Sequence, residues 1–91
     1  MHNYIVTIAY EEGHKLDFAR TTIEDAICEK DAALIAAAAF WKIHLDAEIY
    51  FIDVLPCGEC TRFNKEFEKI DLNLLTPPDN LEWKYYRGGS A

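Results

Sequence analysis

The sequence predicts a single α+β domain in which one four-stranded sheet carries helices on one face, in the order β-β-α-β-α-β. Three observations support this prediction: alternating apolar residues on both sides of an N-terminal turn, an alanine-rich segment with helical periodicity, and a short apolar run after it. A sheet buries one face and a helix one stripe, so helices packed on a single sheet face are the simplest arrangement. We expect residues 1–86 to form the domain and residues 87–91 to form a flexible C-terminal tail.

The first two strands are expected to form an antiparallel hairpin. From Asn3 to Tyr10 apolar side chains occupy alternate positions, as in a strand with one buried face. Gly13 can adopt positive φ, which places the turn at residues 11–14. The β-branched residues that lead to Ile23 indicate the second strand. Residues 24–30 fit either a capped helix start or a continued strand, and continuation or a short irregular segment is favoured.

The next two elements are a helix and a central strand. The helix is expected to begin near Asp31 and to end at Leu45. Its six alanines freeze no side-chain rotamers on folding and let the backbone lie close to a sheet. The most apolar stretch, Glu48 to Leu55, predicts a central strand that ends before Pro56.

The C-terminal third is expected to hold a shorter helix and a last strand. Phe63, Phe67 and Ile70 recur at spacings of three and four, which predicts a helix that begins at about residue 60. A proline-containing loop then leads to Leu81 and Trp83, which alternate with polar residues as in a strand.

The charge of the chain restricts the classes of partner. Sixteen acidic residues against nine basic ones give a net charge of −7. Direct binding to nucleic acid or to anionic lipid needs a basic surface, so neither is expected. No apolar segment is long enough to span a membrane and no signal peptide is evident, which favours a cytoplasmic protein.

One motif has a named chemistry, Cys57-Gly58-Glu59-Cys60. Two cysteines at this spacing, after a strand and before a helix, resemble the thiol redox motif of thioredoxin-like proteins. The same pair would also supply half of a tetrahedral zinc site. A thiol redox or metal-stabilised domain that uses Cys57 and Cys60 is therefore the alternative function.

Apart from Cys57 and Cys60, no arrangement of residues predicts catalysis, a cofactor or a metal site. The chain contains no phosphate-binding glycine loop, nucleophile motif or zinc-protease motif. His44 is expected near the end of the alanine-rich helix, where an imidazole interacts favourably with the terminal carbonyl groups. We therefore expect a protein that is not an enzyme.

The hypothesis that fits best is a small acidic protein-binding module. Acidic residues concentrate before and at the start of the central helix, and aromatic residues end the chain. Charge can steer a basic protein surface toward such a domain, and aromatic side chains commonly supply the strongest contacts of an interface. The expected partner is a basic protein surface, homo-oligomers remain open, and the expected contact residues are Glu24, Asp25, Glu29, Asp31, Trp83 and Tyr85.

A family resemblance adds to this hypothesis. The hairpin Asn3–Ile23, the helix Asp31–Leu45 and the strand Glu48–Leu55, in an acidic chain of under a hundred residues, resemble small phage-encoded proteins that include anti-CRISPR inhibitors. The resemblance implies an inhibitor that blocks a basic nucleic-acid-binding surface of a host defence complex. Those families share no motif, so no residue role follows from it.

Overall fold

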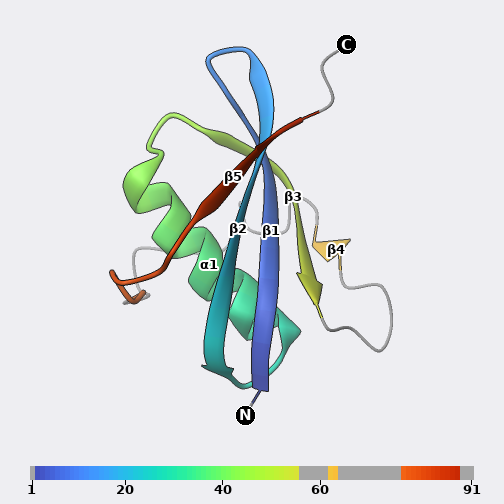
Figure 1. Cartoon of the computed structure of the whole chain (residues 1–91), viewed down its shortest axis with the longest axis vertical. Coiled ribbons are helices and arrows are strands. Elements are labelled where there is room, and N and C mark those ends of the chain that lie inside the picture. The colour runs from blue at the N-terminus through green and yellow to red at the C-terminus, as the bar shows by residue number, and fades with distance from the viewer. Residues whose placement is uncertain (1, 56–61, 64–76, 89–91) are drawn as a thin grey trace.

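One antiparallel sheet forms the body of the molecule, and one helix crosses one of its faces (Figure 1). The computed structural model describes residues 2–55, 62–63 and 77–88. The strands follow the order β4-β3-β1-β2-β5 across the sheet. The elements are β1 (His2–Glu12), β2 (Lys15–Ala26), α1 (Glu29–Ile43), β3 (Glu48–Leu55), β4 (Arg62–Phe63) and β5 (Lys84–Arg87).

The predicted four-stranded sheet with the order β-β-α-β-α-β is wrong. The described part of the chain is mostly β, with five strands and one helix. At the expected start of the second helix, Arg62 and Phe63 instead form a strand that pairs with Asp53 and Ile52 of β3. Phe67 and Ile70, on which that helix prediction also depends, lie outside the described residues. The guanidinium of Arg62 donates two hydrogen bonds to Asp53, at 2.8 and 3.0 Å. Local periodicity contains no information about such a distant partner, so the pairing overrides it.

The predicted hairpin is confirmed. Its two-residue turn holds Gly13 at φ 62° and His14 at φ 66°, the left-handed pair of a type I′ turn. The strand continues beyond Ile23 to Ala26, across a bulge at which Asp25 has φ 58°. The side-chain carbonyl of Asn3 accepts a hydrogen bond from the Asp25 N–H at 3.1 Å and holds the bulge in place.

Helix α1 begins two residues earlier than predicted. Cys28 is its N-cap residue, and Asp31 lies in the first turn. The carboxylate of Asp31 accepts a hydrogen bond from the backbone N–H of Ile27 at 3.0 Å, which joins the helix start to the preceding loop. The helix ends when His44 leaves the helical conformation.

The hydrophobic core lies between α1 and the sheet. On β1 the even-numbered side chains from Tyr4 to Tyr10 face the helix and are buried, whereas Ile5 on the opposite face is exposed. The helix contributes small side chains together with one large ring, that of Phe40. The core residues from the sheet include Tyr4, Val6, Ile8, Tyr10, Ala19, Ile23, Ile49, Ile52 and Val54.

The opposite face of the sheet is covered by no element that the structure describes. Phe18 and Phe51 lie on it with ring centroids 6.5 Å apart, on either side of the buried Ala9. Within residues 2–55, 62–63 and 77–88, no helix is both long enough and apolar enough to cross a membrane.

Candidate functional site

A groove of about 900 Å³ lies between the second half of β2 and the segment that leads into β5. Residues 20–25 form one wall, and residues 78–84 contribute the other. Ile5 and Ile35 also line it, from β1 and α1. The groove thus combines a strand edge with side chains from both sides of the sheet.

The groove exists because β5 covers only part of β2. Pairing between the two strands runs from Asp17 to Arg20 and stops there. Before β5, the side chain of Trp83 turns toward the core, where its ring lies 5.7 Å from that of Phe40. The hydroxyl of Thr21 also donates a hydrogen bond to the backbone carbonyl of Glu82 at 2.8 Å. These contacts hold the segment beside the sheet without strand pairing to β2 beyond Arg20.

The uncovered part of this edge presents unpaired backbone groups. In an antiparallel strand, alternate residues direct their N–H and C=O groups to opposite neighbours. The carbonyl of Leu16 accepts a hydrogen bond from Gly88, so the even-numbered residues of β2 face the β5 side. Thr22 and Glu24 share this parity and lie beyond the last pair with β5. Among the described residues, their outward N–H and C=O groups therefore have no partner strand.

The open end of the groove is acidic. Glu24 and Asp25 line it from β2, and Glu82 lines it from the facing segment; all three are exposed. The basic residues Arg20 and Lys84 lie at the other end, where β5 already pairs with β2. A ligand on the free edge would therefore meet carboxylates.

The structure brings the four predicted acidic residues to one end of the molecule. Glu24 and Asp25 end β2, while Glu29 and Asp31 lie in the first turn of α1, a few residues later. One carboxylate oxygen of Asp31 already accepts a hydrogen bond from the backbone N–H of Ile27, so Asp31 is less available to a partner than the other three residues.

The two predicted aromatic residues lie elsewhere. Trp83 is half-buried against Phe40, and Tyr85 is 50% exposed beside His44 at the end of α1. His44 follows Asp31 by 13 positions, which correspond to about 20 Å at the helical rise of 1.5 Å per residue. Tyr85 and the acidic residues at the start of α1 therefore do not form one patch.

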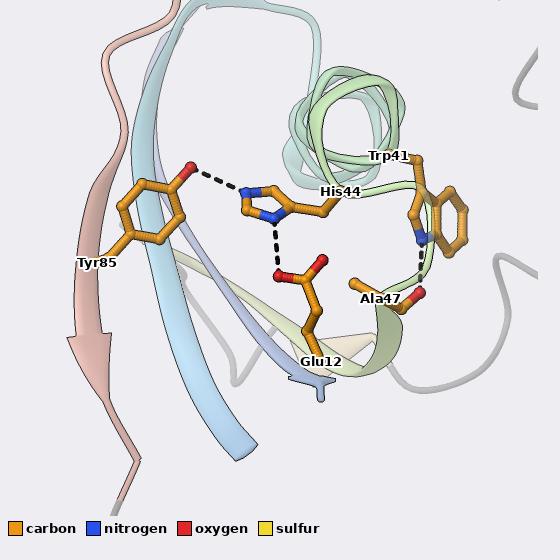
Figure 2. Close-up of polar contacts among 5 residues, drawn as sticks. All are labelled: Glu12, Trp41, His44, Ala47 and Tyr85. Carbon is orange, nitrogen blue, oxygen red and sulfur yellow. Dashed lines mark hydrogen bonds and ion pairs between the residues drawn. The ribbon is translucent and has the colours of Figure 1, made fainter. Parts of the chain in front are cut away.

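A second polar cluster lies at that far end of α1 (Figure 2). His44 Nε2 lies 3.0 Å from the Tyr85 hydroxyl, and His44 Nδ1 lies 3.4 Å from a carboxylate oxygen of Glu12. Burial, and next the nearby charge of Glu12, raise the pKa of Tyr85. A carboxylate can only accept, so Nδ1 donates to Glu12, and in the neutral ring Nε2 then accepts a hydrogen bond from the Tyr85 hydroxyl. The His44 ring also stacks on Phe40 with centroids 4.4 Å apart.

This cluster joins three elements, because Glu12 ends β1, His44 is the C-cap residue of α1 and Tyr85 lies in β5. Close to this cluster, Trp41 donates a hydrogen bond from Nε1 to the carbonyl of Ala47 at 3.3 Å, which closes the turn before β3 (Figure 2). Sequence reasoning found a structural role for His44 but no link to Glu12 or Tyr85. No spacing in the sequence connects positions so far apart.

Metal-ligating and thiol groups give no further site in the described part of the chain. No three His, Cys, Asp or Glu side chains within residues 2–55, 62–63 and 77–88 are placed to hold a metal ion. Cys28 is a free, exposed thiol. Cys57 and Cys60, on which the redox and zinc hypotheses depend, lie outside the described residues.

No family model matches the chain, and neither a curated protein nor a solved structure matches it. A function can therefore be argued only from the chemistry of the groove and its surroundings.

Proposed function

We propose that this chain is a protein-binding module that acts by occupying a basic surface of a partner protein. The observation that carries the proposal is the position of Glu24, Asp25 and Glu82 around one open groove. Carboxylates on an exposed concave surface raise the local concentration of a basic partner and speed its association.

The charges of the groove remain available to a partner. Among the described residues, Asp53 forms an ion pair with Arg62, and the carboxylate of Glu12 lies within hydrogen-bond distance of His44. Glu24, Asp25 and Glu82 are absent from both. Their carboxylates are hydrated in the free protein and can exchange water for the ammonium or guanidinium groups of a partner.

The form of action we propose is steric exclusion. A basic protein surface that binds nucleic acid presents its lysines and arginines to phosphate groups, and an acidic module bound there would displace the nucleic acid. The resemblance to small phage-encoded inhibitors supports a bacterial defence complex as the target class.

The proposal is tested by binding kinetics against a partner captured by pulldown from a host lysate. We expect the association rate to fall steeply between 50 and 300 mM salt, because the Debye length shortens from about 14 Å to about 6 Å over that range. The double variant Glu24→Lys with Asp25→Lys should slow association at least tenfold.

The matched control carries the same charge change at a distance. Asp46 and Glu48 are exposed residues near the start of β3, so Asp46→Lys with Glu48→Lys changes the net charge equally but leaves the groove intact. Equal slowing by the two double variants, or an association rate that is independent of salt, would show that the acidity serves only solubility.

A further inference from the structure

We propose that the partner contributes an extended segment, which adds as a strand to the free edge of β2 at Thr22 and Glu24. This inference rests on the proposed function, since it names the part of the partner that the acidic groove receives. Strand addition to an exposed sheet edge is a common mode of peptide recognition, in which backbone hydrogen bonds supply affinity and alternate side chains supply specificity.

The edge has the geometry that an added strand requires. Thr22 and Glu24 each direct an N–H and a C=O away from β1, and two residues of a strand span about 6.8 Å. An added guest strand that continues the direction of β5 along β2 would form backbone hydrogen bonds with both residues. It would displace none of the strand pairs that the structure shows. The bulge at Asp25 ends the regular edge and limits the guest to a short stretch of its chain.

Within residues 77–88, no segment extends the pairing along this edge, and the charges there help to explain why. Phe18 pairs with Tyr86 and Arg20 with Lys84, so a longer β5 would place Glu82 opposite Thr22. Glu82 would then be a diagonal neighbour of Glu24, and like charges at such positions are unfavourable. Instead, the Glu82 carbonyl accepts a hydrogen bond from the side chain of Thr21, and Glu82 makes no strand pair with Thr22.

The side chains around the edge define the chemistry of the guest. On the open sheet face a guest residue would lie beside Glu24, which favours lysine or arginine. On the helix face its neighbours would be Ile23, Ile35 and Leu81, all of which line the groove. A β-branched apolar side chain suits that position. The guest is therefore a segment in which basic and β-branched residues alternate.

The probe is the capped peptide Lys-Val-Arg-Val-Lys, which reads the same in either direction and carries the expected alternation. We expect it to bind the full chain by fluorescence anisotropy. We also expect it to slow amide hydrogen exchange at Thr22 and Glu24 at least tenfold while leaving His14, in the hairpin turn, unchanged.

Two variants separate the backbone contact from the side-chain contact. Thr22→Pro removes the outward N–H and keeps the β1 side intact, because proline is tolerated where the N–H of an edge strand faces solvent. It should weaken peptide binding at least tenfold. Thr22→Ala keeps the N–H and should change affinity less than twofold.

A second measurement uses the unaltered protein in case Thr22→Pro does not fold, which circular dichroism would reveal. Methylation of alternate backbone nitrogens of the peptide removes its edge donors but keeps its charge, and it should weaken binding as much as Thr22→Pro does.

Salt-sensitive binding that withstands both changes would overturn strand addition and leave the acidic docking proposal standing. A peptide that fails to bind while the captured partner binds with salt-dependent kinetics would also overturn strand addition alone. If no basic partner binds in a salt-dependent way, the proposed function itself fails.

Discussion

The two faces of the sheet are stabilised in different ways, although they share the same strands. On β1, Ile8 faces α1 and is fully buried, whereas Ile5, three residues earlier, is 42% exposed on the other face. The open face relies instead on contacts between neighbouring strands, such as the Arg62 guanidinium 3.9 Å from the Phe51 ring centroid and Arg20 5.3 Å from that of Tyr86. Burial stabilises the first face, and exposed pairwise contacts, which contribute less, occupy the second.

This comparison shows where the molecule can carry a binding function. A partner that touches the covered face would have to displace α1, whereas no described element would have to move for a partner to contact the open face or the β2 edge. Substitutions that separate stability from binding should therefore be found on the open side.

Phe40→Ala should have the largest effect on the covered face. The ring is fully buried and contacts Tyr10, His44 and Trp83. Its loss should reduce the free energy of unfolding by about 3–5 kcal/mol. Urea denaturation at pH 7 measures this loss, and Leu45→Ala, at a side chain that is 81% exposed, should stay within about 0.5 kcal/mol of the unaltered protein. Comparable losses in the two variants would contradict a core centred on Phe40.

A pair of isoleucines on one strand sharpens the comparison directly. Ile8→Ala should cost about 2–4 kcal/mol because it leaves a cavity under α1. Ile5→Ala removes the same atoms from the open face and should cost about 1 kcal/mol or less. Chemical denaturation of both variants gives the difference, and equal losses would mean that the open face is covered in solution.

The cluster of Glu12, His44 and Tyr85 lies at the end of α1, at the border of the covered face. Substitutions in this cluster should reduce the free energy of unfolding less than substitutions in the core. Tyr85→Phe removes one hydrogen bond to His44 and should cost about 0.5–1.5 kcal/mol. His44→Ala also removes the stack on Phe40 and should cost about 1–2 kcal/mol. A double-mutant cycle should give a coupling of at least about 0.5 kcal/mol, and additive losses would mean that the two side chains do not interact.

Alkaline pH should weaken the covered face. Burial raises the pKa of Tyr4 and of Tyr10 above the ordinary value of 10.0. The folded state then holds protons that the unfolded state has lost, so this stability is complete below pH 10 and is lost as pH rises toward the folded pKa. Denaturation midpoints measured from pH 8 to pH 11 should fall, and less so for Tyr10→Phe. An identical fall in that variant would assign the effect to other groups.

Local patterns in the sequence were enough for the hairpin, the helix and β3. Alternation around Gly13 and the alanine run each follow from contacts between residues close in sequence. Cys28, which has no side-chain hydrogen bond to the helix, nevertheless occupies the cap position, so the helix start was predicted two residues late. Helix boundaries depend on such details and are therefore harder to predict than the helix itself.

The positions of the two edge strands, β4 and β5, could not be predicted from the pattern of apolar residues. Arg62 and Phe63 pair with β3 because that edge is available in the folded sheet, and β5 joins β2 on the opposite side from β3. Neither location is encoded in the spacing of apolar residues. The same applies to the groove, which exists because β5 is shorter than β2 and which joins residues from both ends of the chain.

The alanines of α1 have a consequence for how the protein tolerates change. Ala33, Ala36 and Ala37 are fully buried and belong to the core beneath the helix, so their methyl groups set the distance between helix and sheet. A larger side chain there has no space and must push the two layers apart, even though leucine is a good helix former. In a library of all single substitutions, these positions would accept glycine or serine more readily than valine or leucine. The buried alanines are thus the positions of α1 at which a larger residue is least tolerated. A helix that is rich in alanine is for this reason strongly constrained in sequence.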